Sequence, residues 1–385
     1  MTFCFLASET IESMTRNGVI APGGTIGILG GGQLGRMLAS AAAEMGLHAH
    51  VYCPDDDLPA AEVAAHVTRA AYEDEAALAR FAESVDAVTY EFENVPAETA
   101  RILSEHGIVR PGARALATAQ DRHVEKSFLT SHGILTAPFA DVTDEMSLHA
   151  AVEEIGTPSV LKTRRFGYDG KGQAKIAAPG DALAAYAEIG RQPAILEGFV
   201  AFEREISVIV ARGPGGETAA YDPVENIHKN HILDRTLAPA ALTLALADEA
   251  CAIAARIANE LDYVGVMGVE MFLLPEAGNK RRLLVNEIAP RVHNSGHWTM
   301  DACAVSQFEQ HMRAVCGWPL GNPRRHSDAV MTNLIGGEVD GWERLAAEPD
   351  TAIHLYGKRD ARPGRKMGHA TRLYPLGKRP PVTPS

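Results

Sequence analysis

The chain has 385 residues, and its 36 Lys and Arg against 49 Asp and Glu give a formal net charge of −13. This acidic balance argues against a protein whose main partner is nucleic acid or an anionic membrane surface. Hydrophobic residues at 46% and charged residues at 22% are close to globular averages, which excludes global disorder. No apolar run is long enough for a membrane span, and five cysteines without a CxxC pair favour a reduced, cytoplasmic protein.

The first 24 residues differ in composition from the rest of the chain. They lack a basic segment and are interrupted by acidic residues, which argues against a secretory signal. We expect residues 1–24 to form a disordered extension, and Met14 is an alternative start of the protein.

A regular alternation of strands and helices begins at Thr25 and predicts a parallel α/β domain over residues 25–117. An Ala-rich helix follows the first strand and is expected to end at Gly46. The expected strands are 25–29, 48–53, 86–92 and 107–112.

A glycine pattern, GxGxxG, follows the first strand at Gly30, Gly32 and Gly35, and Asp55 and Asp56 lie about 20 residues further on. Alone, this pattern indicates a dinucleotide site and a nicotinamide dehydrogenase. The alternative is a glycine turn that packs a helix onto the sheet or holds another phosphate. The rest of the chain favours the alternative.

The sequence pattern changes after Pro111. Mixed and largely antiparallel strands predict an α+β domain over 118–320, within which residues 118–198 form a small lid subdomain. The last segment, 321–385, predicts a small β-rich domain with a short Pro-rich tail. The fold class is therefore α/β and α+β, with three domains after the extension.

Two helices are predicted in the second domain. Asp121 is the expected N-cap of one, which Gly133 should end. The other is a long Ala-rich helix over 240–261, followed by a β-hairpin.

The segment from Lys162 to Gln173, KTRRFGYDGKGQ, combines a strand end with a glycine-rich loop. Glycines let backbone N–H groups approach a polyphosphate, and Lys162 and Lys171 would neutralise it. The alternative is an ordinary hairpin tip, where Asp-Gly is a common turn dipeptide.

Two carboxylates, Glu270 and Glu287, are expected on facing strands of the hairpin. Counting from the turn places Glu270 opposite about Val285, with Glu287 on the same face and Asn286 on the other. Burying two like charges is costly unless a cation compensates, and Mg²⁺ prefers carboxylate oxygens. The alternative is a charged strand face in solvent.

Three further groups of residues are candidates for ligand binding. Arg291 and His293 follow the carboxylate strand and suit a small oxyanion such as bicarbonate or phosphate. Glu91 and Glu93 end a strand where α/β sheets place ligands, although a capped strand end is an equal alternative. The basic run over 358–366 suits a phosphate-bearing substrate, or else a solvated turn.

The chain resembles the ATP-grasp superfamily and, within it, the 5-(carboxyamino)imidazole ribonucleotide synthetases, from about Ile26 to Leu376. The resemblance implies a Rossmann-like pre-ATP-grasp domain, an ATP-grasp domain and a C-terminal domain. The motifs that carry it are GILGGGQLGRM, YEFENVP, QDRHVEKSFL, GYDGKGQ, EGFVAFEREISV, VNEIAPRVHNSGHWT and HLYGK…RPGRKMGHAT.

The resemblance implies a ligase that converts ATP, bicarbonate and 5-aminoimidazole ribonucleotide into the carboxyamino product, ADP and phosphate through carboxyphosphate, in purine biosynthesis. It implies ATP with Mg²⁺ or Mn²⁺ as cofactors, a homodimer, and transient transfer of the product to a separate mutase. Two alternatives stay open. One is another ATP-grasp ligase, such as a formate-dependent glycinamide ribonucleotide transformylase or a biotin carboxylase, and the other is a non-catalytic nucleotide-binding module.

The resemblance also implies the roles of individual residues. The implied catalytic residues are Arg291, His293 and Lys171. The implied ATP-binding residues are Arg122, Lys162, Gly167, Tyr168, Asp169, Gly170, Lys171, Gly172, Gln173, Glu197, Gly198, Phe199, Val200, Glu205, His228, Asn286 and Glu287. The implied substrate-binding residues are Glu91, Glu93, Tyr168, Lys358 and Arg365, and the implied metal ligands are Glu270 and Glu287.

Overall fold

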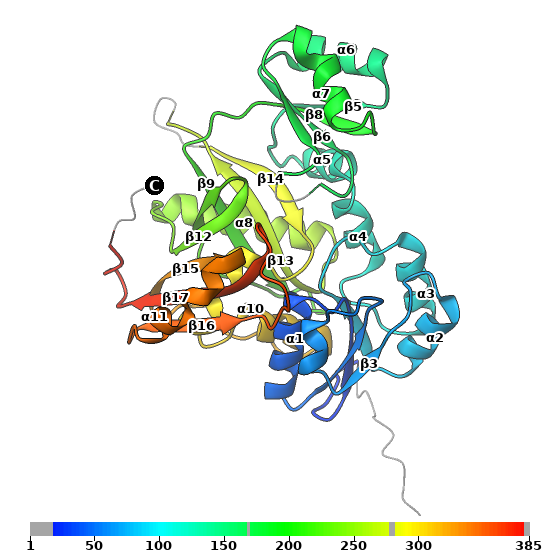
Figure 1. Ribbon diagram of the computed structural model, residues 1–385, viewed down its shortest axis with the longest axis vertical. Coiled ribbons are helices and arrows are strands. Elements are labelled where there is room, and N and C mark those ends of the chain that lie inside the picture. Colours follow the sequence, from blue (N-terminus) through cyan, green and yellow to red (C-terminus); the bar gives the residue numbers. More distant parts are fainter. Residues whose placement is uncertain (1–17, 168–169, 277–281, 381–385) are drawn as a thin grey trace, which may run out of the picture.

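The computed structural model describes residues 18–167, 170–276 and 282–380. Three β-sheets organise this part of the chain. In Figure 1 the N-terminal domain, in blue and cyan, lies at the lower right, and a small green sheet with its helices stands apart at the top. The largest sheet lies between and beside them and continues into the orange and red C-terminal strands.

The N-terminal domain is a parallel sheet with the strand order β3-β2-β1-β4, which confirms the predicted α/β domain. Its strands are β1 (Thr25–Leu29), β2 (His48–Tyr52), β3 (His66–Thr68) and β4 (Ala87–Tyr90). Its helices are α1 (Gln33–Glu44), α2 (Glu75–Glu83), α3 (Ala97–His106) and α4 (Ala113–Ala119).

The predicted strand at 107–112 is wrong, because this segment makes only one isolated bridge, between Val88 and Val109. Pro111 lacks an N–H group and cannot extend the ladder beyond it. The fourth strand is instead β3, a three-residue strand too short for a clear pattern.

Residues 18–24 belong to the folded domain, so the expectation of disorder over 1–24 is wrong for this part; residues 1–17 lie outside the described residues. Ile20 is buried, and its backbone N–H donates to the carbonyl of Cys316 at 2.9 Å. The indole N–H of Trp318 donates to the carbonyl of Ile20 at 2.6 Å. These bonds attach the start of the domain to a segment late in the chain.

The small sheet at the top of Figure 1 is antiparallel, has the order β5-β8-β6-β7, and possesses its own hydrophobic core. It corresponds to the predicted lid. Its strands are β5 (Phe139–Val142), β6 (Ser159–Thr163), β7 (Gln173–Ile176) and β8 (Ala194–Gly198). Its helices are α6 (Glu145–Ile155) and α7 (Ala182–Glu188), and α5 (Arg122–Ser131) precedes it in the chain.

The large sheet has the order β14-β13-β9-β11-β12-β15-β17-β16, with β10 added beside β9. The strands β15, β17 and β16 continue this sheet, so the C-terminal domain shares one sheet with the ATP-grasp segment. The strands are β9 (Arg204–Arg212), β10 (Thr218–Ala220), β11 (Val224–Lys229), β12 (Ile232–Ala238), β13 (Gly265–Leu273), β14 (Leu283–Ala289), β15 (Asp328–Ile335), β16 (Thr351–Leu355) and β17 (Lys366–Tyr374).

Two helices cover opposite faces of this sheet. Val208 and Val210 of β9 join one core cluster with α8 (Leu244–Glu260), whereas Ile209 and Ala211 join another with α10 (Gln307–Cys316). Alternate strand residues point to opposite faces, so a strand buried on both sides is apolar throughout. Two shorter helices, α9 (Thr299–Ala302) and α11 (Trp342–Ala346), belong to the C-terminal half.

Helix ends follow local signals in the sequence. Asp121 caps α5 by accepting from the N–H groups of His123 and Val124, and Gly133 has a positive φ of 67° just after the helix, both as predicted. The helix expected from 240 begins later, because Thr243 is its N-cap and accepts from Leu246 N–H.

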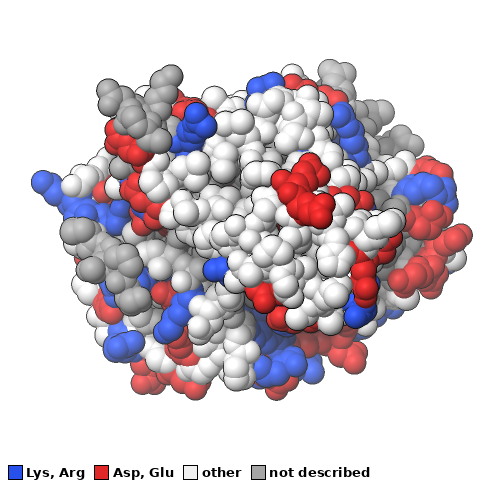
Figure 2. Space-filling view, turned by 90° about the horizontal axis from the view of Figure 1, so that it is seen from above, with Lys and Arg blue, Asp and Glu red and all other residues white. Residues whose placement is uncertain are grey.

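Surface charges of both signs are interspersed among larger uncharged areas on the face shown in Figure 2. Within the described ranges, we find no helix with the length and apolar character needed to cross a lipid bilayer. The four cysteines of the same ranges are free thiols.

Candidate active site

A cavity of about 1090 Å³ lies where the three sheets approach one another. The large sheet curves around it, so that Glu270 of β13 and Lys366 of β17 line the same space. Most of the predicted site residues line this cavity, namely Glu91, Glu93, Arg122, Lys162, Gly167, Gly170, Lys171, Gln173, Glu197, Gly198, Phe199, Val200, Glu205, His228, Glu270, Asn286, Glu287, Arg291 and His293.

Five predicted residues do not appear in that lining. Gly172 and Arg365 are sequence neighbours of lining residues, and Lys358 donates to the carbonyl of the lining residue Lys366, while Tyr168 and Asp169 fall outside the described residues.

The carboxylates of Glu270 and Glu287 stand directly opposite each other on β13 and β14. The predicted register is wrong by two positions. A β-bulge after this pair accounts for one of them, and the pairing nearer the turn, where Leu273 faces Leu283 and Met271 faces Val285, accounts for the other. The extra residue at the bulge is Asn286, which lines the cavity beside Glu287 instead of pointing to the other face. A bulge interrupts strict alternation, and this one adds an amide to the carboxylate pair.

The two carboxylates differ in their environments. Burial, and then repulsion from Glu287, raises the pKa of Glu270 to about 8. Burial would also raise the pKa of Glu287, but Arg122 outweighs it and holds this pKa at about 2. The guanidinium of Arg122 lies 2.9 Å from the Glu287 carboxylate. The negative charge of Glu287 is therefore compensated by Arg122, whereas Glu270 has no such arginine partner in the described structure.

Helix α5 supplies two charged side chains, Arg122 and Glu125, to the cavity wall, and it carries a third, Lys126, which is buried outside the lining. Arg122 pairs with Glu287, and the carboxylate of Glu125 accepts a hydrogen bond from Ile288 N–H, which fixes the strand that carries Glu287. Lys126 is 1% exposed and reaches Glu197 at 3.7 Å. The roles of Glu125 and Lys126 were not predicted, although positions three and four after Arg122 share its helix face.

Glu197 on β8 is buried between two lysines. The ammonium of Lys162 lies 2.9 Å from the Oε2 atom of its carboxylate, and that of Lys126 lies 3.7 Å from the same oxygen. Burial would raise the pKa of Glu197, but the lysines overcome it and hold this pKa at about 2. The segment after Glu197 (Gly198, Phe199, Val200) forms the adjacent cavity wall.

A second ion pair and a pair of aromatic rings border the same end of the cavity. Glu205 and His228 contact each other, and although burial lowers the pKa of His228, the bond to Glu205 raises it overall. Phe202 and Phe272 stack with ring centroids 4.6 Å apart, which gives this wall a flat apolar surface. Neither aromatic ring was predicted as a site residue.

The glycine-rich loop joins β6 to β7, whose ladder ends with Lys162 opposite Gln173. Gly170 and Gly172 have φ values of +79° and +71°, which L side chains rarely adopt. A Cβ atom on Gly172 would lie 2.6 Å from the Thr163 hydroxyl. The backbone can therefore pass this closely only because the side chains are absent.

Arg291 and His293 follow β14 and differ in charge. Arg291 pairs with Glu93, and this contact holds the guanidinium against the cavity. Burial, and then the nearby Arg291, lowers the pKa of His293 to about 3, so its ring is neutral near pH 7. The Nδ1 atom of His293 lies 2.8 Å from the Ser295 hydroxyl, and Nε2 lies 3.3 Å from Glu270. His293 is thus a neutral hydrogen-bonding group beside the carboxylate pair.

The glycine turn at the start of α1 is occupied by a side chain of the protein itself. The Glu91 carboxylate accepts from Gly32 N–H, and from Gly35 N–H at 2.6 Å. A pyrophosphate in a dinucleotide site would need these same N–H groups. This arrangement argues against the dehydrogenase alternative. Glu91 and Glu93 also have different partners, since Glu91 accepts from the α1 turn and Glu93 pairs with Arg291.

The basic run lies beside this turn. The ammonium of Lys358 donates to the carbonyl of Lys366 at 2.7 Å, and Arg365 reaches Asp57 of the N-terminal domain at 2.9 Å. Burial, and then Arg365, lowers the pKa of Lys358 to about 8, while Glu91 acts in the opposite direction. Cationic groups and the start of α1 thus meet at one end of the cavity.

The three parts of the chain match known domain families. Residues 24–120 match the ribonucleotide synthetase preATP-grasp domain, residues 127–308 the ATP-grasp domain, and residues 329–375 the phosphoribosylaminoimidazole carboxylase C-terminal domain.

Similar proteins extend over nearly the whole chain. An N5-carboxyaminoimidazole ribonucleotide synthase of Brucella melitensis is 52% identical, covering 92% of this chain and 98% of its own, and one of Bacillus subtilis is 42% identical, covering 92% of each. The ADP complex of an N5-carboxyaminoimidazole ribonucleotide synthetase superposes with a TM-score of 0.88 at 43% identity, covering 94% of both chains.

A further solved structure combines a nucleotide with a second ligand. The Aspergillus clavatus N5-carboxyaminoimidazole synthase, in complex with ADP and 5-aminoimidazole ribonucleotide, has a TM-score of 0.85 at 31% identity, with 92% of this chain and 94% of that chain covered. With the sheets, the paired carboxylates and these relatives in agreement, the chain belongs to the N5-carboxyaminoimidazole ribonucleotide synthase family of ATP-grasp ligases.

Proposed function

We propose that this protein carboxylates 5-aminoimidazole ribonucleotide with bicarbonate at the expense of ATP, in de novo purine biosynthesis. The products are N5-carboxyaminoimidazole ribonucleotide, ADP and phosphate. The observation that carries the proposal is one cavity in which the paired carboxylates, Lys162 and Arg291 meet. These groups suit a nucleotide, a divalent cation and a small oxyanion in adjacent positions.

Glu270 and Glu287 are the proposed ligands of Mg²⁺ or Mn²⁺, with Asn286 beside them. The residues fit such a cation because two buried carboxylates face each other and the Asn286 side-chain oxygen has no hydrogen-bond partner in the described structure. When bound, the cation would neutralise the phosphate oxygens of ATP. Arg122 then keeps Glu287 ionised and oriented.

Arg122 and Lys162 are the proposed cationic contacts of the nucleotide, with Glu287 and Glu197 holding the guanidinium and the ammonium group in place. The backbone after Glu197 would bind the adenine edge, and Glu205 with His228 would face the ribose hydroxyls. The loop with Lys171 would close over the triphosphate, where its glycines allow the backbone to approach the phosphates.

Arg291 and His293 are the proposed bicarbonate site. A bicarbonate oxygen attacks the γ-phosphorus as the bond to ADP breaks, giving carboxyphosphate. The exocyclic amine of the ribonucleotide then attacks the carboxyl carbon, or the CO₂ released from it, and phosphate leaves. This sequence needs positioned charge and exclusion of water, not a covalent nucleophile from the protein.

The ribonucleotide phosphate is proposed to bind to the basic pair Lys358 and Arg365, beside the α1 turn whose N–H groups Glu91 occupies, with Tyr168 near the base or ribose. Glu91 lies closest to this end of the cavity, while Glu93 orients Arg291 toward bicarbonate. A homodimer, a cytoplasmic location and transfer of the product to a separate mutase complete the proposal. Analytical ultracentrifugation of the purified chain tests the dimer.

ADP release with Mg²⁺, ATP and bicarbonate, measured with and without 5-aminoimidazole ribonucleotide, tests the reaction. Strong stimulation that requires both bicarbonate and the ribonucleotide is expected. ATP turnover indifferent to the ribonucleotide would contradict the acceptor and favour another ATP-grasp ligase. Nucleotide binding without any turnover would favour a non-catalytic module.

A further inference from the structure

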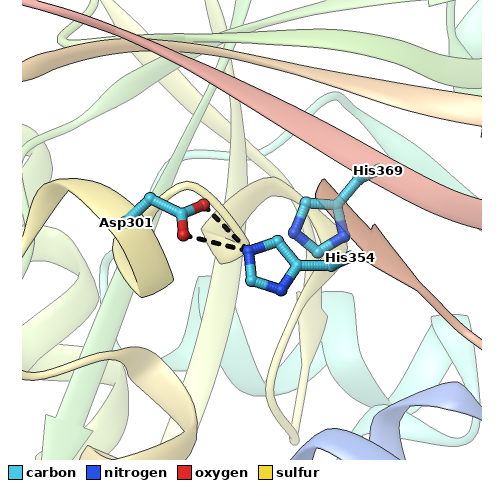
Figure 3. A group of neighbouring side chains, drawn as sticks. All are labelled: Asp301, His354 and His369. Carbon is cyan, nitrogen blue, oxygen red and sulfur yellow. Dashed lines mark hydrogen bonds and ion pairs between the residues drawn. The ribbon is translucent and has the colours of Figure 1, made fainter. Parts of the chain in front are cut away.

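Asp301, His354 and His369 form a compact group on three elements outside the residues that line the active-site cavity (Figure 3). Asp301 lies on α9, and His354 of β16 stands directly opposite His369 of β17. The two imidazole rings stack with centroids 4.6 Å apart and planes 19° apart. The His354 Nε2 atom lies 2.9 and 3.1 Å from the two oxygens of Asp301. One ligand atom from each residue lies within 4.8 Å of the others.

His369 provides an independent sign that this group is incomplete. The residue is fully buried, its Nδ1 atom lies 2.9 Å from the Tyr356 hydroxyl, and its Nε2 atom has no hydrogen-bond partner in the described structure. A buried polar atom without a partner is rare, because nothing replaces the water that it loses on folding. A neutral imidazole whose Nδ1 is held by an oxygen atom presents Nε2 to a metal ion.

We propose that Asp301, His354 and His369 bind one divalent transition-metal ion, with Zn²⁺ as the best match. Two imidazole nitrogens and one carboxylate oxygen are typical zinc ligands, whereas Mg²⁺ prefers oxygen atoms alone. Three protein ligands leave one tetrahedral position for water.

To bring the three ligand atoms to zinc-bonding distances of roughly 2.0–2.2 Å, the two imidazole rings would rotate out of their stacked arrangement. The side chains of Asp301 and His354 are 12% and 25% exposed, which gives the ion a path from solvent.

The position of this site gives the ion a structural role. It would join α9 to β16 and β17, and the segment between these two strands carries Lys358 and Arg365. A bound ion would therefore restrain the basic segment without touching the ligands in the cavity.

Equilibrium dialysis against Zn²⁺ in excess Mg²⁺, followed by elemental analysis of the full-length protein, tests the proposal. We expect about one zinc per chain, and near-complete loss of this zinc in Asp301→Asn and in His354→Gln. His149→Gln, on an exposed position of α6, is the matched histidine control, and Glu270→Gln tests whether the cavity carboxylates hold the zinc instead. Both controls should keep the zinc.

Two further measurements separate binding from folding. Co²⁺ should give the visible absorption of a tetrahedral nitrogen and oxygen site in the wild type and in His149→Gln, but not in His354→Gln. Zn²⁺ should raise the melting temperature of the wild type and leave that of folded His354→Gln unchanged. A folded wild type without bound zinc, or equal zinc in all variants, would overturn the proposal. Because the readout is zinc content, this result is independent of the proposed reaction.

Discussion

Charged side chains around the cavity are paired across elements that are distant in the sequence. Glu287 has Arg122, Glu197 has Lys162, and Glu93 has Arg291. Buried ion pairs add little net stability, but loss of one partner leaves a charge without compensation at a cost of about 3–5 kcal/mol. Their value here is positional, since each pair fixes a group that would face a ligand.

Replacing Glu287 by Gln tests the most constrained of these groups. Loss of one carboxylate removes a proposed cation ligand and leaves Arg122 unpaired, so we expect kcat to fall by about 10²-fold or more. Steady-state ADP release over a range of Mg²⁺ concentrations is the measurement, with Glu153→Gln on exposed α6 as control. Near-normal kcat in a folded Glu287→Gln protein would contradict the proposal that Glu287 is a ligand of the divalent cation.

Lys358 should make ribonucleotide use depend on pH. Its pKa is lowered to about 8, so the side chain is a cation below that pH and becomes neutral above it. We therefore expect kcat/KM for the ribonucleotide to fall above pH 8. At pH values well above the pKa, the fall should approach about tenfold for each pH unit. Lys358→Arg, which stays charged, should move this fall to higher pH. An unchanged profile in Lys358→Arg would assign the titration to another group.

At the scale of elements, the predictable features were those with local causes. Asp121 caps α5 through its own side chain, and Gly133 ends the helix because it accepts a positive φ, so both could be predicted from neighbouring residues. The bulge at Asn286 and the occupation of the α1 glycine turn by Glu91 depend on partners far along the chain. The residues of the site were mostly predictable from motifs, but their pairing was not.

The glycine loop offers a test of backbone geometry. Gly172→Ala places a Cβ atom 2.6 Å from the Thr163 hydroxyl at a φ of +71°, which costs about 1 kcal/mol or more. We expect KM for ATP to rise at least about fivefold, because the loop can no longer keep its path. Gly180→Ala is the matched control, since nothing lies within 4 Å of its added atom. Equal KM values in the two variants would show that the loop does not depend on Gly172.

At the scale of the whole molecule, the cavity is assembled from both ends of the chain. The first glycine turn, the carboxylate hairpin and the C-terminal basic run are separate in sequence, yet Arg365 contacts Asp57 at 2.9 Å and Lys366 lines the cavity with Glu270. The strand order of the large sheet brings this about, and no local pattern predicts it.

The double variant Lys358→Ala with Arg365→Ala tests this junction. Removing both cations should raise KM for the ribonucleotide by about 10²-fold, since charge-assisted bonds to phosphate contribute about 1.5–3 kcal/mol each, while KM for ATP stays within about twofold. Arg362→Ala, an exposed residue of the same run, is the control. Equal increases in both KM values would place the phosphate elsewhere.

The position of β15 in the sheet has a consequence for biosynthesis of the protein. Strand β12 pairs on one side with β11 but on the other with β15, which the ribosome produces much later. Until then, β12 presents an open edge to which other nascent chains could add. Two charged residues lie on this strand: Arg235, which faces Thr332 of β15 in the finished sheet, and Asp234, whose carboxylate lies 3.1 Å from the Arg235 guanidinium. Charged side chains on an unpaired edge strand disfavour pairing with another chain. Charges on β12 would thus lower the tendency of this strand to pair with another chain before β15 takes its place in the sheet.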